Sequence, residues 1–299
     1  MDGESWLIQQ IQAAMADWKL PLGIGDDAAT PPPGEGQLLI SSDTMVEGVH
    51  WDERLSPGDV GWKLVAVNAS DLGAMGARPG WAMLNLSLPD PLDRTWFLDF
   101  LEGLTAAVRH FRLPIIGGDT TRSRQRVLSL TVGGYSRRPL LRSGGRPGDR
   151  LWVSGVLGRA AEAFYSENPS ESAKAWFKRP DPPTSLGVAI AEAGLGHALM
   201  DLSDGLKQDL GRLCAASGCG ARVDPSKIPG VERLDWRVAF GEDYELLLAA
   251  PGEEGPRLAA LAEGLGFRLT EIGELRAEGE VILEGGWPKA LFSHFEGQS

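Results

Sequence analysis

The sequence has few cysteines and no long apolar run. Two cysteines, Cys214 and Cys219, are too few for a disulfide framework or a four-ligand zinc site, so we expect two buried or half-buried thiols in a reducing cytosol. The longest stretch without a charged side chain covers 12 residues, 5–16. A membrane span needs about 20 apolar residues. The acidic start, Met1 to Glu4, lacks the basic residues of a secretory signal. These features predict a cytoplasmic protein with no membrane partner.

Several widespread catalytic motifs are also absent. No lysine follows a glycine, which excludes the phosphate loop G-x-x-x-x-G-K-[ST], and there is no G-x-G-x-x-G loop. Neither the zinc-hydrolase motif H-E-x-x-H nor the nucleophile elbow G-x-S-x-G occurs. The four histidines are far apart, at 50, 110, 197 and 294. These absences remove most routine nucleotide and hydrolase sites.

Positive charge is scarce relative to negative charge. The chain has 29 Lys and Arg against 41 Asp and Glu, a net charge of −12. Such a surface repels a polyphosphate backbone, so nucleic acid is not expected as a partner. If the ligand is an anion, a cation must lie between it and the protein, and divalent metal ions are the obvious candidates.

The apolar patterning predicts a mixture of helices and strands. At 299 residues the chain is long enough for about two domains of roughly 150 residues. Residues 38–40 predict a buried strand that ends at 41–43, and a loop rich in Gly, Arg and Pro at 142–149 separates the two halves. Other expected strands are 81–88, 127–132, 151–154, 244–250, 267–272 and 281–284, and expected helices are 7–18, 56–75, 95–111, 159–166, 185–193, 205–216 and 253–263. Strands outside strict β-α-β alternation favour the α+β class.

Glycine and aspartate are abundant and recur together. There are 39 glycines, and six short acidic clusters stand in turn-like contexts, at 23–28, 41–44, 68–71, 117–120, 201–205 and 241–244. Carboxylate and hydroxyl oxygens are the donors that Mg²⁺ and Ca²⁺ prefer. A single aspartate in a turn is usually a cap, but six clusters together predict a divalent-metal site. Asp71 is the most informative, because it interrupts the apolar run 64–72 and a carboxylate beside a core face requires a partner.

The clusters also occur as a recognisable series. In chain order they read G-I-G-D-D-A-A, S-D-T-M-V-E-G-V-H-W, V-N-A-S-D-L-G-A-M-G-A-R-P, G-G-D-T-T, D-L-S-D-G-L and G-E-D-Y-E-L, from Gly23 to Glu245. Together they resemble the thiamine-monophosphate kinase family, in the superfamily of aminoimidazole ribonucleotide synthetase. The family has Ser-Thr or Thr-Thr before the aspartate of the second motif, and this chain has Ser41-Ser42, which keeps both hydroxyls.

This resemblance implies a fold and an activity. The fold would be the two-domain α+β fold of aminoimidazole ribonucleotide synthetase. Its N-terminal domain, 1–138, would provide metal binding, ATP binding and dimerisation, and an α/β sandwich domain would cover 139–299. The N-terminal domains of a homodimer would form an intersubunit β-barrel. The activity would be ATP-dependent phosphorylation of thiamine phosphate to thiamine diphosphate, the last step of thiamine diphosphate biosynthesis.

The resemblance also implies roles for individual residues. Several Mg²⁺ ions would be held by Asp27, Ser41, Ser42, Asp43, Asp71, Asp119, Asp201 and Asp204. ATP would contact Gly118, Asp119, Arg142 and Ser203. Thiamine phosphate would contact His50, Glu242 and Phe292. No general base is implied, and the metals held by Asp27, Asp43, Asp71 and Asp119 would carry the chemistry.

The expected acceptor explains why no base is needed. A phosphate monoester has a second pKa of about 6 and is largely dianionic at neutral pH. The obstacle is to bring two polyanions together in line, and bridging metals meet it by neutralising and positioning them. We therefore expect direct in-line transfer without a phospho-enzyme.

Other functions remain open from the sequence alone. Sister enzymes of the superfamily use ATP on other acceptors. The selenophosphate branch would want a reactive Cys, Sec or Lys before the first glycine motif, and the hydrogenase-maturation branch a carboxy-terminal cysteine, and neither occurs here. A two-metal phosphohydrolase would also collect aspartates. A non-catalytic metal-binding module is a third alternative, although the EF-hand pattern is absent.

Overall fold

The computed structural model describes residues 3–25, 27–277 and 279–288, which form two compact units. Unit 1 comprises the residues up to 72 together with 77–137, and unit 2 comprises 73–76 and the chain from 138 onward. Each unit combines one sheet with several helices, as the predicted α+β class requires. Among the described helices, none is long and apolar enough to cross a membrane.

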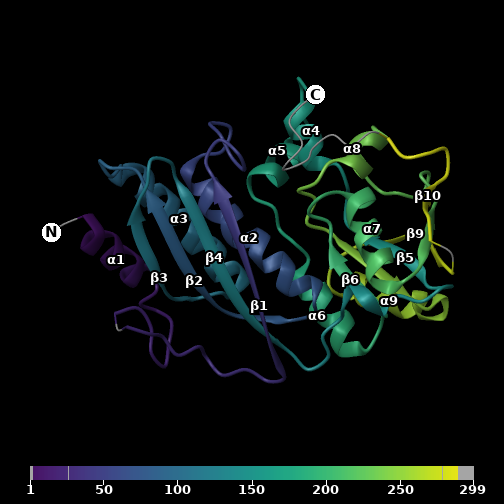
Figure 1. Cartoon of the computed structure of the whole chain (residues 1–299), viewed down its shortest axis with the longest axis horizontal. Coiled ribbons are helices and arrows are strands. Elements are labelled where there is room, and N and C mark those ends of the chain that lie inside the picture. Colours follow the sequence, from purple (N-terminus) through teal and green to yellow (C-terminus); the bar gives the residue numbers. More distant parts are fainter. Residues whose placement is uncertain (1–2, 26, 278, 289–299) are drawn as a thin grey trace. The chain divides into compact units, whose positions relative to one another are not determined.

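Unit 1 is a four-stranded mixed sheet accompanied by three helices (Figure 1). The strand order is β1-β4-β2-β3, with β1 and β2 antiparallel to β4, and β2 parallel to β3. Its strands are β1 (Gln37–Val46), β2 (Arg78–Leu88), β3 (Ile115–Arg122) and β4 (Val127–Ser136), and its helices are α1 (Gly3–Ala14), α2 (Pro57–Ala74) and α3 (Arg94–Phe111). Helix α3 is the crossover that a parallel β2–β3 pair requires.

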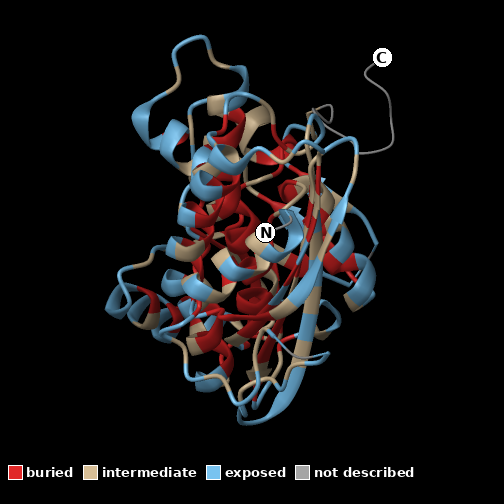
Figure 2. Cartoon of the chain, turned by 90° about the vertical axis from the view of Figure 1, so that its left-hand side faces the viewer, coloured by how far each residue is buried: buried red, intermediate tan, exposed pale blue. Residues whose placement is uncertain are grey.

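Local sequence explains the limits and the packing of α3. The Asp93 side chain accepts a hydrogen bond from the Trp96 amide and caps the first turn, and Arg112 ends the helix in the left-handed conformation. Phe97 and Phe100 lie fully buried on its inner face. Figure 2 shows the same division throughout, with buried residues on the inner sides of helices and exposed residues on their outer sides.

Helix α1 packs on its own unit. The rings of Trp6 and Phe97 lie 5.6 Å apart in an edge-on arrangement, and the Arg94 guanidinium lies 4.8 Å from the Trp6 ring centroid. Leu7 and Ile11 are buried, as the helical spacing predicts. The helix ends at Ala14, earlier than the predicted residue 18.

Two predictions for the strands of unit 1 were wrong. Strand β1 continues to Val46, and Leu38 and Ile40 are 41% and 60% exposed, so the apolar run 38–40 is not buried. β1 is an edge strand, and its side chains alternate between the two faces. The G-G-D-T-T cluster lies inside β3 and not in a turn, because pairing with β2 outweighs the turn preference of its two glycines.

Unit 2 is built on a six-stranded sheet of order β10-β7-β9-β5-β8-β6. Its strands are β5 (Arg150–Ser154), β6 (Ala198–Asp201), β7 (Gly220–Val223), β8 (Leu246–Ala250), β9 (Leu269–Arg276) and β10 (Val281–Leu283). Its helices are η1 (Arg142–Gly144), α4 (Arg159–Tyr165), α5 (Glu171–Lys178), α6 (Thr184–Ala193), α7 (Leu206–Ser217), α8 (Leu234–Ala239), η2 (Gly252–Glu254) and α9 (Gly255–Gly264).

Four of these elements, the helices α5 and α8 and the short strands β6 and β7, were not predicted, nor were the two 3-10 turns η1 and η2. Helix α5 buries only Ala173 and Phe177, too few apolar positions for a clear helical period, and its Ser170 cap provides the main local signal. Helix α8 is only six residues long, and β6 and β7 have four residues each. Short elements of this kind are set by tertiary packing.

The two cysteines belong to the core of unit 2. Cys214 on α7 and Cys219 just beyond it are free thiols, 2% and 6% exposed, packed among the apolar residues of the sheet and helices. The prediction of two buried, unpaired thiols is confirmed. Burial raises the pKa of the Cys214 thiol to about 12.

Candidate active site

The first cluster of predicted site residues joins β1 to α2. The Ser41 hydroxyl donates a hydrogen bond to Asp71 Oδ2 at 2.5 Å. The backbone N–H of Asp43 donates to Asn68 Oδ1 at 3.0 Å, and Asn68 Nδ2 in turn donates to the Leu64 carbonyl at 2.8 Å. The structure thus brings Ser41, Asp43 and Asp71 to one corner. Asn68 stands three residues before Asp71, on the same helix face, and the sequence analysis did not assign it a role.

Ser42 does not share this corner. Successive side chains of a strand point to opposite faces, so the Ser42 side chain lies on the other face of β1 from Ser41 and Asp43. There its hydroxyl is 2.9 Å from Thr131 Oγ1, and it donates to the Leu130 carbonyl at 3.3 Å. The side chain of Ser42 therefore points away from Asp71.

Asp119 lies at the opposite edge of the same sheet. The pairing register places Asp43, Leu130, Leu84 and Gly118 in one row across β1, β4, β2 and β3. Three inter-strand spacings of about 4.8 Å separate the two edges by about 14 Å. Within one subunit a single ion cannot bridge such a separation, so the side chains of Asp43 and Asp119 of the same chain do not meet at one point.

The loop that carries Asp27 passes beside β3. A Cβ at Gly117 would lie 3.8 Å from the Ala29 Cβ, which places this loop against the G-G-D-T-T strand. Gln12 of α1 donates to the Ile24 carbonyl at 3.0 Å and ties the start of the loop to α1. The side chains of Asp27 and Asp119 are both exposed.

The donor chemistry of unit 1 suits a hard cation, although the carboxylates are dispersed. Within the described ranges, no three His, Cys, Asp or Glu side chains gather closely enough to hold an ion between them. The groups at the two edges are carboxylate and hydroxyl oxygens, which fit Mg²⁺ and do not suit a soft metal. With so few protein ligands at each point, phosphate oxygens and water would have to complete the coordination.

His50 is held in a defined orientation by the turn after β1. Its Nδ1 accepts a hydrogen bond from the Val46 amide at 3.0 Å, and its own amide donates to the Val46 carbonyl at 2.9 Å. A ring nitrogen that accepts from an amide carries no proton, so the neutral ring is protonated at Nε2. His50 therefore presents a hydrogen-bond donor at Nε2.

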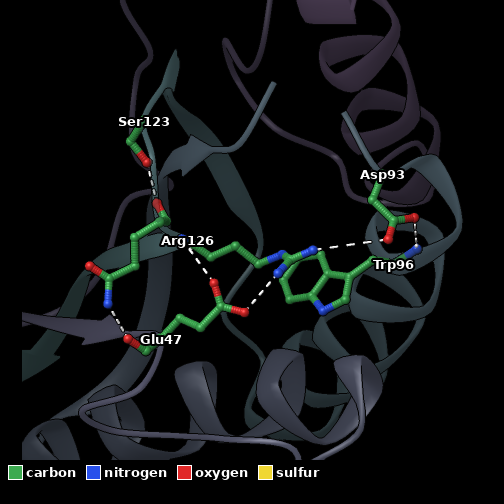
Figure 3. Close-up of polar contacts among 6 residues, drawn as sticks. Glu47, Asp93, Trp96, Ser123 and Arg126 are labelled. Atoms are coloured by element: carbon green, nitrogen blue, oxygen red, sulfur yellow. Dashed lines mark hydrogen bonds and ion pairs between the residues drawn. The ribbon is translucent and has the colours of Figure 1, made fainter. Parts of the chain in front are cut away.

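A charged cluster that the sequence analysis missed supports this turn (Figure 3). Arg126 Nη1 lies 2.7 Å from Glu47 Oε1, and the Glu47 amide donates to the Arg126 carbonyl at 3.0 Å. The Arg126 guanidinium lies 4.4 Å from the Trp96 ring centroid and 4.0 Å from the Asp93 carboxylate, the same carboxylate that caps α3. Glu47 precedes His50 by three residues, so this cluster ties the His50 turn to β4 and α3.

In unit 2 most of the predicted residues lie close together, where β6 ends and β8 begins. Strands β5 and β6 both run antiparallel to β8, so the ends of β5 and β6 meet the start of β8. Asp201 is the last residue of β6 and is 2% exposed. The Glu242 amide donates to the Ser203 carbonyl at 2.9 Å, and the Tyr244 amide to the Leu202 carbonyl at 2.8 Å. The D-L-S-D-G and G-E-D-Y-E motifs, 40 residues apart in the chain, are therefore neighbours.

Asp204 is surrounded by groups that sequence reasoning did not single out. Arg212 Nη1 pairs with the Asp204 carboxylate and lies 2.7 Å from Asp209 Oδ1. The Asp204 amide donates to Asp209 Oδ2 at 2.9 Å. Asp209 is fully buried, and burial raises its pKa to about 6. The available signal was the i,i+3 pair of Asp209 and Arg212 on α7.

The remaining predicted residues lie apart from this pairing. Arg142 is exposed in η1, where its carbonyl accepts a hydrogen bond from Ser217 Oγ at 2.6 Å. Phe292 lies outside the described residues.

Comparison with known proteins places this arrangement in a family. The model of the N-terminal domain of AIR synthase related proteins matches residues 25–136, and the model of their C-terminal domain matches residues 146–286. The chain is 37% identical over 304 residues to the thiamine-monophosphate kinase of Escherichia coli K12, covering 92% of each chain.

Solved structures agree with this assignment. The crystal structure of thiamine-monophosphate kinase from Stenotrophomonas maltophilia K279a superposes with a TM-score of 0.85 at 37% identity, over 93% of this chain and 96% of that one. The structure of AaThiL complexed with AMPPCP and TMP superposes with a TM-score of 0.76 at 29% identity, over 96% and 95%.

The two matched domains make this chain an AIR synthase related protein with the two-domain α+β fold of that class. Within that class it belongs to the thiamine-monophosphate kinases, a family of ATP-using phosphotransferases. The expectation drawn from the six motifs is confirmed at the level of family and enzyme class.

Proposed function

We propose that this chain transfers the γ-phosphate of ATP directly to thiamine phosphate, giving thiamine diphosphate and ADP, as the last step of thiamine diphosphate biosynthesis in the cytoplasm. The observation that carries the proposal is the corner formed by Ser41, Asp43 and Asp71, on a chain alignable over 96% of its length with AaThiL complexed with AMPPCP and TMP. Direct transfer follows from the acceptor, which is already a nucleophile at neutral pH.

The proposal assigns each substrate to a set of contact residues. We assign ATP to Gly118, Asp119, Arg142 and Ser203, and thiamine phosphate to His50, Glu242 and Phe292. The Nε2–H of His50 is a donor suited to a phosphate oxygen, because its Nδ1 is occupied by the Val46 amide. Arg142, exposed on η1, would offer a guanidinium fork to a phosphate.

The same proposal assigns Mg²⁺ to the acidic groups at both edges of the unit 1 sheet and to the β6 end. The assigned ligands are Asp27, Ser41, Ser42, Asp43, Asp71, Asp119, Asp201 and Asp204, with Ser42 acting through its main-chain oxygen because its hydroxyl lies against Thr131 on the other face of β1. When bound, Mg²⁺ would neutralise phosphate charge and hold the two substrates in line. The 14 Å or so between the sheet edges calls for more than one ion. The Asn68 amide fixes the backbone at Asp43, and the Ser41 hydroxyl orients the Asp71 carboxylate.

We also propose that the chain acts as a homodimer through β1, with the residues 1–138 forming the N-terminal domain of each subunit and 139–299 the C-terminal domain. β1 is an edge strand, and Leu38 and Ile40 expose 41% and 60% of their surface on it. An edge strand has unpaired backbone N–H and C=O groups, and an exposed apolar face beside them favours pairing with another sheet. Both features support an intersubunit barrel. Light scattering of Ile40→Glu against wild type tests this, and a wild-type monomer would refute it.

A coupled ADP-release assay with Mg-ATP and thiamine phosphate, with chromatography of the product, tests the activity. We expect thiamine diphosphate in one-to-one ratio with ADP. Asp71→Asn keeps the size and the acceptor for Ser41 but removes the charge, so turnover should fall by at least about 100-fold while the protein stays folded. Chelation of Mg²⁺ should abolish turnover of the wild type reversibly.

Other outcomes would point to other functions. ADP release without thiamine diphosphate would indicate a phosphohydrolase or a sister enzyme with another acceptor. A phosphorylated protein isolated during turnover would refute direct transfer. Folded protein that binds Mg²⁺ without turning over ATP would indicate a binding role.

A further inference from the structure

A group of buried charges lies beneath the turn that carries Glu242, and none of its members has a role assigned above. Asp243 and Glu245 are 1% and 3% exposed, and the side chain of Arg159 is 18% exposed. Burying charged groups is costly unless each is paired and hydrogen-bonded. The cluster therefore requires an explanation beyond ordinary packing.

Both carboxylates are hydrogen-bonded to residues 154–159, which run from the last residue of β5 to the first residue of α4. Glu245 Oε1 accepts from Arg159 Nη2 at 2.8 Å and from the Val156 amide at 3.3 Å, and Oε2 accepts from Ser154 Oγ at 2.5 Å. Asp243 Oδ1 accepts from the Gly158 amide at 2.8 Å. The residues on either side of Tyr244 are thus tied to one connection, 154–159.

An indole ring links the guanidinium to the main chain of the same turn. The Arg159 guanidinium lies 3.5 Å from the Trp176 ring centroid, a close cation–π contact. The Trp176 Nε1–H donates to the Asp243 carbonyl at 3.1 Å. Arg159 therefore acts on the turn in two ways, through Glu245 and through the ring that holds Asp243.

The turn itself is strained and needs such support. Glu242 and Tyr244 have φ angles of 63° and 48°, in the left-handed region, where a non-glycine residue costs about 1–3 kcal/mol. A Cβ at Gly155 would lie 1.9 Å from Glu245 Oε1, so the carboxylate fits only because this position is glycine. The contacts of 154–159 hold the turn in a conformation that it would otherwise leave.

We propose that Arg159 is a positioning residue that, through Glu245 and Trp176, holds the 242–244 turn so that Glu242 is aligned to bind thiamine phosphate. This inference rests on the proposed function, because it takes Glu242 as a contact of thiamine phosphate. Arg159 touches neither substrate in this account. Its effect falls on the affinity for one substrate and not on the transfer step.

Loss of Arg159 should disturb the turn specifically. Burial raises the pKa of both Asp243 and Glu245, and the guanidinium opposes this rise in both. The guanidinium also holds the turn through two contacts, the hydrogen bond from Nη2 to Glu245 Oε1 and the cation–π contact with the Trp176 ring, and both are lost with it. Without these contacts the turn can relax from its strained conformation, which displaces the backbone at Glu242.

The test compares Arg159→Met with Arg150→Met by steady-state kinetics and by calorimetric titration with thiamine phosphate. Arg150, the first residue of β5, forms an ion pair with Glu274 at 2.9 Å in which both side chains are about 40% exposed. It is therefore a control in which an arginine of the same unit loses an exposed ion pair in place of a buried one. We expect Arg159→Met to raise the KM and the Kd for thiamine phosphate by about tenfold or more, with the KM for Mg-ATP and kcat within about threefold. Arg150→Met should change none of these.

A double variant separates positioning from charge compensation. In Arg159→Met/Glu245→Gln the buried pair is removed together, which should restore thermal stability close to wild type, since a paired removal leaves less uncompensated charge. If Arg159 positions the turn, the weak binding of thiamine phosphate persists in this stable protein. Wild-type binding in the double variant, or equal weakening of both substrates in Arg159→Met, would overturn the inference.

The outcomes also distinguish this inference from the proposed function. If wild-type protein fails to bind thiamine phosphate, the proposed function falls, and this inference falls with it. If the wild type binds thiamine phosphate and Arg159→Met binds it equally well, only the positioning role of Arg159 is refuted.

Discussion

Substitution of Gly118 tests how the sheet of unit 1 presents Asp119. Its φ is 150°, a backbone conformation that L residues rarely adopt, and a Cβ there would lie 1.8 Å from the Leu84 carbonyl oxygen on β2. Cβ contacts below 3.0 Å are essentially never seen. In Gly118→Ala the two backbones would have to separate, which breaks the β2–β3 pairing beside Asp119.

The loss of stability in Gly118→Ala is the sum of a backbone strain and an overpacking contribution. The strained backbone costs about 1–3 kcal/mol, and overpacking against a main chain that cannot rotate away costs about 1–3 kcal/mol. We expect Gly118→Ala to lower the free energy of unfolding by about 2–6 kcal/mol. At about 3 °C per kcal/mol, Tm would fall by about 6–18 °C.

Gly117→Ala is the matched control. A Cβ at Gly117 would lie 3.5 Å from the end of the flexible Met83 side chain, an ordinary contact, and φ there is not positive. Its effect should stay within about 1 kcal/mol, since alanine suits a strand interior at least as well as glycine. Thermal unfolding followed by circular dichroism, with titration of an ATP analogue, compares the two variants. Equal Tm values and equal nucleotide binding would refute the reasoning.

Three further predictions follow from other parts of the chain. Arg126→Ala loses the contacts with Glu47 and Trp96 and should lower the free energy of unfolding by about 1–2 kcal/mol in a denaturant titration. The control Arg54→Ala, which removes a more exposed ion pair with Asp52, should change it by less than about 0.5 kcal/mol. Burial raises the pKa of Asp243 above its ordinary 3.8. As the pH rises from 3.8 to this raised pKa, the unfolded chain has lost the proton that the native protein keeps, so the free energy of unfolding falls. Asp243→Asn cannot ionise, so its Tm should exceed that of wild type at pH 8 by an amount that shrinks toward pH 4, and an equal difference at both values would contradict this. With a pKa of about 12, the Cys214 thiol should react with a chromogenic disulfide at pH 8 at least about 100-fold more slowly in native than in unfolded protein, and rapid labelling of native protein would show that it is not in the core.

Local sequence signals were sufficient for the elements with a long period or a strong cap. Helix α3 has the Asp93 cap and a repeated apolar face, and its predicted range agrees with the structure to within one residue. The order and spacing of the six acidic motifs were sufficient for the family and enzyme class. These features are properties of contiguous residues, so they can be read without knowing which segments meet.

Tertiary structure decided what depends on contacts between distant segments. The apolar residues Leu38 and Ile40 are exposed because β1 is at an edge of the sheet, and strand order is not a local property. The separation of Asp43 from Asp119, the pairing of Asp204 with Arg212 and the pairing of Glu245 with Arg159 all depend on which strands and loops meet. The sequence by itself determined which chemical groups this protein has and to which family it belongs. Strand pairing and burial determined which of those groups meet, because a charged side chain acquires its partner only when the chain folds.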